Sequence, residues 1–242
     1  MHSQEIFIQT WGLYLEKDGY CRKGNAYYHC LPDAQLIKLI RMENMGAGFY
    51  FIVASIACYA DAIDMNEFKH RTIYDVSSIM DYLEKKHVCG MLIDRSLEQS
   101  LEEDRERFDR YFMPIVNDVN SVQDCYRFNK YVLGITGGDW RSLSSEDLLF
   151  ESFQCGFYDE TLQLAQRSYK SVRQRYQRAK YYHNHDGSIS KEQLLAEEKD
   201  MQQYSEWIED LRTGAYDRLA NELQRRIDIS RKSCSKFFAW RM

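Results

Sequence analysis

The sequence predicts an α+β fold: an N-terminal helix with an antiparallel sheet, followed by a mostly helical C-terminal part with a long helical hairpin. Three observations lead to this prediction. Short apolar segments separated by turn residues fill positions 20–60, apolar residues recur at helical spacing from position 96 onward, and the two prolines are Pro32 and Pro114. Because proline is absent from the long periodic segments, these segments can form uninterrupted helices.

The first predicted element is a helix over residues 4–17. Its apolar side chains, among them Phe7, Trp11 and Leu15, fall on one stripe, and polar side chains occupy the other side. Gly19 follows at a position where a glycine commonly ends a helix. One face of this helix is therefore expected to be buried.

An antiparallel meander is expected to follow over residues 20–60 and to pack against this helix. Residues 26–31 have the composition of a strand, and residues 35–42 return after a Pro-Asp turn pair. The apolar pattern of the second segment alone also fits a helix, so its flanking turns decide for the strand. A second turn is predicted over residues 43–48. Residues 49–57 are apolar on both faces, which is typical of a central strand covered on each side.

A glycine- and tyrosine-rich run connects the predicted helix to the sheet. It reads Asp-Gly-Tyr-Cys-Arg-Lys-Gly-Asn-Ala-Tyr-Tyr-His from Asp18 to His29, and it is followed by a strand that ends at Asn44 and an aromatic strand from Phe49. With these residues the first 60 positions resemble the opening of a bacterial domain-of-unknown-function family. Its members carry Gln-Lys-Ser after the second strand, where this chain has Glu-Asn-Met. The resemblance implies a helix with paired strands and no established activity, and some members resemble immunity or accessory proteins.

From Ser96 onward the sequence predicts helices. Helices over residues 96–113 and 115–133 are expected to be separated at Pro114, which suits the first turn of a helix. Glycines and serines over residues 134–145 predict a loop. The Ser-Ser-Glu-Asp run at its end resembles the start of a further helix.

The clearest periodic signal begins at Tyr158, where apolar and tyrosine side chains alternate by four and three positions up to Ala179, as in a coiled coil. A second helix is predicted to begin near Ser190. Residues 161–182 carry six basic side chains and no acid, whereas residues 192–210 carry seven acids and one lysine. An antiparallel hairpin would place the basic helix beside the acidic one. Apolar burial is expected to hold the hairpin, with charge setting its register.

Length and composition are those of a globular protein. The chain has 242 residues, of which 44% are hydrophobic and 29% charged, enough for one large domain or two small ones. We expect an α+β domain over residues 1–95, a helical segment over residues 96–157, and a helical hairpin with a C-terminal helix over residues 158–242.

Charge and cysteine usage restrict the class of partner and the compartment. A net charge of −5 argues against broad, nonspecific binding to nucleic acid or anionic membranes. Seven cysteines without a Cys-x-x-Cys pair, and an N-terminus without the features of a signal peptide, favour a reducing compartment. No apolar run approaches the length of a membrane span. We therefore expect a cytoplasmic protein that does not bind a membrane.

Arg178 and His183 have the Arg-x4-His spacing of helical ribonucleases that resemble the HEPN class. An imidazole can act as acid and base beside a guanidinium that stabilises developing phosphorane charge. Such sites form by dimerisation of helical domains. Ala179 follows the arginine, where that class often has a polar residue, and a solvated helix end is the alternative interpretation. A HEPN-like ribonuclease is the alternative function.

Two segments suggest metal sites, and neither has the full ligand set. Residues 185–190 resemble the middle of an EF-hand loop, but Tyr182 and Gln193 fall where the first ligand and the bidentate carboxylate belong. A second candidate is the set Cys21, His29 and Cys30, whose side chains can bind zinc. Their spacing matches no common zinc motif. Phosphate-binding and common hydrolase motifs are also absent from the sequence. We expect no metal, no cofactor and no catalytic site.

Three side chains of the basic helix are the candidate interaction residues: Tyr169, Arg173 and Tyr176. Tyrosine and arginine are enriched at contact surfaces, and pairing with the acidic helix is the alternative use for them. The preferred hypothesis is a non-enzymatic binding protein, of the immunity or accessory type, that masks a protein partner. An oligomeric scaffold built through the hairpin is a second alternative. A protein partner is expected. Two other partners stay open: nucleic acid at the basic helix, and a second copy of the chain.

Overall fold

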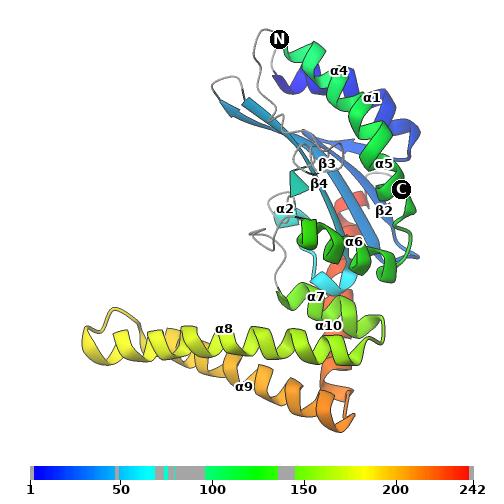
Figure 1. Cartoon of the computed structure of the whole chain (residues 1–242). Helices are drawn as coiled ribbons and strands as arrows, with labels where there is room; N and C mark the ends of the chain where they lie inside the picture. Colours follow the sequence, from blue (N-terminus) through cyan, green and yellow to red (C-terminus); the bar gives the residue numbers. More distant parts are fainter. Residues whose placement is uncertain are drawn as a thin grey trace. The chain divides into compact units, whose positions relative to one another are not determined.

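Figure 1 presents a computed structural model of the chain, which describes residues 3–46, 49–68, 74–75, 79, 96–135 and 145–239. The fold class is α+β, as predicted. The chain divides into two compact units: Met1–Leu143 together with Ile227–Met242, and Ser144–Arg226. The sequence predicts three segments, residues 1–95, 96–157 and 158–242, and their boundaries differ from those of these two units. The three-segment division stays a prediction.

The first unit is built on one antiparallel sheet whose strands follow one another in chain order. They are β1 (Cys21–Lys23), β2 (Ala26–Leu31), β3 (Leu36–Gly46), β4 (Phe49–Cys58) and β5 (Tyr74–Asp75). The predicted meander is therefore confirmed, including the strand interpretation of residues 35–42. The described side chains of β4 are almost all buried, which confirms a central strand covered on both faces.

The turn predicted over residues 43–48 is wrong at its start. β3 continues to Gly46, and Glu43 and Asn44 pair with Phe51 and Tyr50 of β4. The register of the pairing between β3 and β4 shifts between Asn44 and Gly46, as at a β-bulge. Glutamate and asparagine are weak strand formers, but strand propensity depends on context, and a long apolar partner strand outweighs it. Residues 47–48 lie outside the described residues.

Helices complete the first unit. They are α1 (Ser3–Lys17), the 3-10 turn η1 (Tyr59–Asp61), α2 (Met65–Phe68), α4 (Leu97–Arg107), the π-helical turn η2 (Phe108–Phe112), α5 (Met113–Asp118), α6 (Val122–Ile135) and the C-terminal part of α10 (Asp217–Phe238). The predicted helix over residues 4–17 is confirmed. Its Trp11 is fully buried and donates its indole N–H to the Leu101 carbonyl at 2.9 Å, which fixes α1 against α4.

The predicted helix over residues 115–133 is interrupted. α5 ends at Asp118 and α6 begins at Val122, because Ser121 caps the new helix by accepting a hydrogen bond from the Asp124 amide at 3.1 Å. Pro114 does lie in the first turn of α5, as expected. Of the loop predicted over residues 134–145, its first two residues belong to α6, Ser145 begins α7, and residues 136–144 lie outside the described residues.

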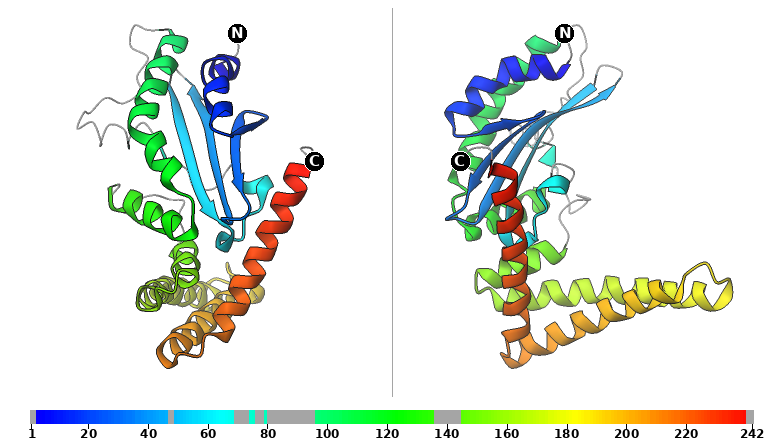
Figure 2. Two further views of the ribbon diagram at one scale, coloured as in Figure 1. Left: turned by 90° about the vertical axis from the view of Figure 1, so that its right-hand side faces the viewer. Right: turned by 180° about the vertical axis from the view of Figure 1, so that it is seen from behind.

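Alternation along β2 directs successive side chains to opposite faces of the sheet. Tyr27 faces α1, where its ring centre is 6.0 Å from that of Phe7. Tyr28 faces the C-terminal part of α10, where its ring centre is 5.1 Å from that of Phe237. Figure 2 shows this part of α10 running along the sheet. The sheet therefore has a helix on each side of β2.

The second unit consists of α7 (Ser145–Gln154), α8 (Tyr158–His185), α9 (Lys191–Thr213) and the first turns of α10. The predicted helical hairpin is confirmed, since α8 and α9 lie side by side in Figures 1 and 2. Ser190 caps α9 by accepting the Gln193 amide hydrogen at 3.2 Å, and Gly214 ends the helix with a φ of 76°. Among the described helices, none has both the length and the apolar character that crossing a lipid bilayer requires.

Candidate functional site: a groove on the helical hairpin

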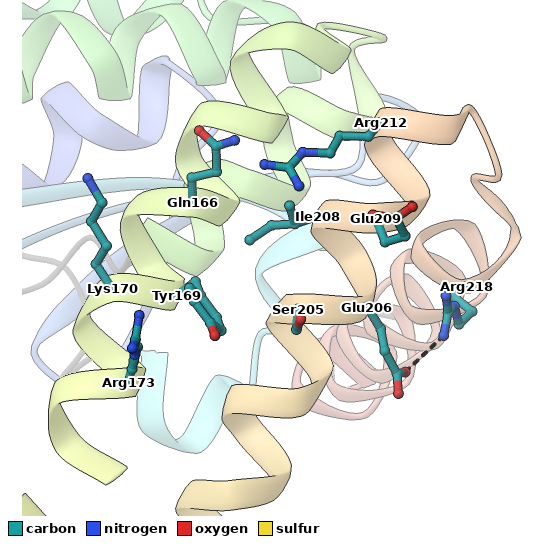
Figure 3. Close-up of a pocket in the computed structure, with 10 residues that line it drawn as sticks. All are labelled: Gln166, Tyr169, Lys170, Arg173, Ser205, Glu206, Ile208, Glu209, Arg212 and Arg218. Carbon is teal, nitrogen blue, oxygen red and sulfur yellow. Dashed lines mark hydrogen bonds and ion pairs between the residues drawn. The ribbon is translucent and has the colours of Figure 1, made fainter. Parts of the chain in front are cut away.

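A groove of about 590 Å³ lies along the hairpin of the second unit (Figure 3). One wall comes from α8 and the other from α9, and Arg218 of α10 is drawn beside Glu206 of α9. The residues that line it are Gln166, Tyr169, Lys170, Arg173, Ser205, Glu206, Ile208, Glu209, Arg212 and Arg218. Two of the three predicted interaction residues, Tyr169 and Arg173, therefore meet in one site.

The floor of the groove is apolar. Ile208 is buried and Tyr169 is half-buried, and Figure 3 shows both side chains in the space between the two helices. Tyr169 lies on the periodic stripe of α8 that also buries Ala165 and Val172. The same stripe that pairs the helices therefore supplies the floor, and a bound side chain can extend it.

Positive charge surrounds this floor. Lys170 and Arg173 are exposed on α8, and Arg212 is exposed in the last turn of α9, where Figure 3 shows it reaching toward Gln166. Among the residues that the structure describes, these three cations have no ion-pair partner. A ligand that brings carboxylates to them would not have to displace an internal partner.

The fourth lining cation, Arg218, belongs to the framework of the groove. It donates to both carboxylate oxygens of Asp210, at 2.6 and 2.7 Å, and to Glu206 at 2.9 Å. Hydrogen bonding to Asp210 raises the pKa of Arg218 above its ordinary value. Because Asp210 is buried, this contact fixes the start of α10 against α9. Glu209 is then the lining acid that can oppose the three unpaired cations.

The hairpin uses few of its charges internally. Arg175 contacts Glu197 at 3.2 Å and Asp200 at 3.4 Å across the two helices. Within the described residues, the other cations of the basic segment form no ion pair (Arg167, Lys170, Arg173, Arg178 and Lys180). The expected pairing of the two helices is confirmed, and among the described residues Arg175 is the one cation of residues 161–182 that forms ion pairs with the acidic helix. Exposed pairs stabilise by only about 0–1 kcal/mol, so little favours forming them.

The distal half of the hairpin has almost no core of its own. Ala179 is the one buried residue of residues 173–203. Three large apolar or aromatic side chains there remain exposed: Tyr181 at 54%, Tyr182 at 46% and Leu195 at 52%. This arm therefore offers surface that contact with another molecule can cover.

Tyr176, the third predicted interaction residue, is half-buried on α8 and does not line the groove. The ammonium of Lys180 lies 5.9 Å from its ring centre. The composition of the sequence did not indicate the α9 wall, above all Ile208 and Arg212, because acidic side chains dominate that helix. Their spacing of four residues places them on one side of a helix and is the signal that could have found them.

The two residues of the ribonuclease alternative lie on α8, and the structure gives one of them another role. His183 Nδ1 is 2.8 Å from the carbonyl oxygen of Ile189, so its ring closes the turn of the hairpin. Arg178 is exposed. Neither residue lines the groove.

Local hydrogen bonds involve the two segments that resemble metal sites in sequence. Cys21 donates to the Tyr28 carbonyl at 3.2 Å across β1 and β2, and the next residue, His29, projects to the opposite face of the strand. In the turn of the hairpin, Asp186 accepts the Ser188 amide hydrogen at 2.9 Å, and hydrogen bonding from Ser188 lowers the pKa of that carboxyl. An Asx turn therefore shapes the segment that resembles an EF-hand loop.

No protein-family model, curated protein or solved structure matches this chain. The resemblance of the first 60 residues to a bacterial family thus stays a prediction. The functional conclusion rests on the geometry of the groove.

Proposed function

We propose that this is a non-enzymatic binding protein that holds a segment of a partner protein in the groove of its helical hairpin. The observation that carries the proposal is the set of three exposed cations without internal partners, Lys170, Arg173 and Arg212, around an apolar floor. A segment with carboxylates beside an apolar side chain fits this pattern. Covering the half-buried Tyr169 ring would add affinity, and the cations would add specificity.

The charge pattern favours a protein over a nucleic acid. Glu209 lies on the α9 wall together with Arg212, so the groove carries both signs of charge. A protein segment can carry both signs, whereas a phosphate backbone carries only negative charge and would be repelled by the carboxylate. The net charge of −5 for the whole chain acts in the same direction.

The arm beyond the groove supports the same proposal. Tyr181 and Tyr182 are large side chains of the type that anchors protein interfaces, and both are exposed. Tyr181 stacks on His185 with ring centres 3.9 Å apart, which restricts its motion before any partner arrives. A restricted anchor loses less conformational entropy on binding.

The experiment uses a photo-cross-linking amino acid in the groove. Replacing Ser205, an exposed lining residue, in the full chain should capture the partner from extracts of the native host. The double variant Lys170→Glu/Arg173→Glu should then weaken binding of the captured partner about 10- to 100-fold, since reversing two exposed charges at a contact is worth about 1.4–2.8 kcal/mol. The matched control is Arg167→Glu/Lys180→Glu, which reverses two exposed cations of the same helix outside the groove.

The alternatives give different outcomes in the same experiment. Capture that is lost after nuclease treatment would assign the groove to nucleic acid, and capture of the chain itself would support the oligomeric scaffold. RNA cleavage by the purified protein that Arg178→Ala and His183→Ala both abolish would establish the ribonuclease. Equal binding by the groove variant and its control would contradict the proposal.

A further inference from the structure

One face of the C-terminal part of α10 meets the sheet of the first unit residue by residue. Ser230, Cys234 and Phe237 are four and three positions apart, so they share one side of the helix. At one end Ser230 donates to the Tyr59 carbonyl at 2.8 Å. At the other end the Phe237 ring centre is 5.1 Å from that of Tyr28. Cys234 lies between these two contacts.

On the sheet, the corresponding position is Cys30. It is two residues beyond Tyr28 on β2, so both side chains project to the face that α10 covers. The Tyr59 hydroxyl lies 3.6 Å from the Cys30 sulfur, and the thiols of Cys30 and Cys234 are close enough to perturb each other's pKa. Two thiols separated by most of the chain are therefore side by side in the fold.

We propose that Cys30 and Cys234 are a peroxide-reactive thiol pair that closes to a disulfide between β2 and α10. The Cys30 thiolate attacks one oxygen of the peroxide, forms a sulfenic acid and releases hydroxide, which takes up a proton to become water. The Cys234 sulfur then attacks the sulfenic sulfur and displaces its oxygen as a second water. Two thiols lose two electrons and two protons, and one hydrogen peroxide becomes two water molecules.

The surroundings make the two sulfurs unequal, as such a sequence requires. Cys30 is half-buried, whereas Cys234 is only 3% exposed. Hydrogen bonding from Cys234, and secondarily from Tyr59, lowers the pKa of the Cys30 thiol against the opposing effect of burial. The hydrogen bond to Cys30 and burial raise the pKa of Cys234. Cys30 is thus the sulfur that attacks first, and Cys234 is the one that resolves the sulfenic acid.

Two other described cysteines bond to oxygen or nitrogen. Cys58 donates to Asp61 at 3.7 Å, and Cys125 accepts from Asn129 at 3.5 Å. Both are buried. Cys155 is half-buried, like Cys30, and provides a matched control for exposure.

The test treats the reduced, full-length protein with hydrogen peroxide, blocks free thiols with N-ethylmaleimide and maps the digested protein without reductant by mass spectrometry. We expect a linked peptide that joins Cys30 to Cys234, lighter by two hydrogens than its separate halves and resolved by dithiothreitol. This measurement uses the wild-type protein alone, so its result does not depend on whether any variant folds.

Three variants separate the roles of the sulfurs. Cys234→Ser should leave Cys30 as a sulfenic acid that dimedone traps, Cys30→Ser should leave Cys234 unmodified, and Cys155→Ser should form the linked peptide as the wild type does. Reaction of Cys30 at pH 7 should be about tenfold faster than that of a free thiol, because more of it is ionised. The proposal is overturned if Cys30 pairs mainly with another cysteine, or if it oxidises no faster than Cys155.

Discussion

Ser230 joins the C-terminal part of α10 to the segment that follows β4 through two hydrogen bonds. Its side chain is fully buried, and its hydroxyl donates to the Tyr59 carbonyl at 2.8 Å while accepting the Ile63 amide hydrogen at 2.6 Å. One hydroxyl thus satisfies two backbone groups that follow β4 and are 167 and 171 positions away in the chain. Ser230→Ala removes both hydrogen bonds and little else, since the two side chains differ by one oxygen.

The expected magnitude follows from what each backbone group retains. The Tyr59 carbonyl still accepts the Ala62 amide hydrogen at 3.3 Å, so its loss is that of one ordinary hydrogen bond, about 1 kcal/mol. The Ile63 amide, on a fully buried residue, loses the hydroxyl that accepts from it, which costs about 1–3 kcal/mol. We expect Ser230→Ala to lower the free energy of unfolding by about 2–4 kcal/mol.

Two measurements check this value: urea unfolding of the full chain, and hydrogen exchange of the peptide that contains Ile63. The matched control is Ser233→Ala, one turn along the same helix, where a half-buried hydroxyl accepts only the Met65 amide hydrogen at 2.9 Å. Its cost should be about 1 kcal/mol. Equal costs for the two variants, or unchanged exchange at Ile63, would refute the reasoning.

Three further predictions concern other buried or capping contacts. Tyr50→Phe should cost about 2 kcal/mol in the free energy of unfolding, because a buried hydroxyl donates to the Asp104 carboxylate at 2.7 Å. Burial lowers the pKa of Lys38 below 10.5, so the unfolded chain binds more protons as that value is approached. The unfolding free energy of the wild type should therefore rise relative to that of Lys38→Met as the pH increases toward 10.5. Ser190→Ala removes the cap that accepts the Gln193 amide hydrogen and should cost about 1 kcal/mol, measured as lost helicity and thermal stability of the second unit.

Each of these has its own control. Tyr14→Phe removes a similar hydrogen bond, from Tyr14 to Asp109 at 3.0 Å, but at an exposed site, and should cost less than Tyr50→Phe when unfolding is followed in urea. For the lysine, stability curves of wild type and Lys38→Met that stay parallel with pH would contradict the shift. For the cap, Ser188→Ala in the same turn should leave stability within about 0.5 kcal/mol of the wild type.

Local patterns predicted most of the fold because local physics decides most of it. Alternation and turn residues located the strands, and the periodic stripe of α8 is buried at Ala165, Val172 and Ala179 as expected. The errors fall where a tertiary or capping contact overrides propensity. Pairing with β4 extends β3 through Glu43, and the Ser121 cap divides one predicted helix into two.

The candidate site was only half predictable for a related reason. Tyr169 and Arg173 could be proposed from the composition of one helix, but Ile208 and Arg212 reach the same groove only because the hairpin brings α9 beside α8. A single helix shows which residues share its face, and it does not show which face of another helix they meet. The same limit hid Cys234, since spacing arguments grouped Cys30 with its near neighbours in sequence.

The weak internal pairing of the hairpin follows from energetics and bears on function. An exposed ion pair adds at most about 1 kcal/mol, while ordering two long side chains opposes it. Pairing α8 with α9 therefore depends on buried side chains such as Val172 and Leu211. Charges that the fold does not need can remain available without a loss of stability. Substituting Lys170 and Arg173 should for that reason alter binding while leaving the unfolding free energy within about 0.5 kcal/mol, which separates a contact surface from a structural one.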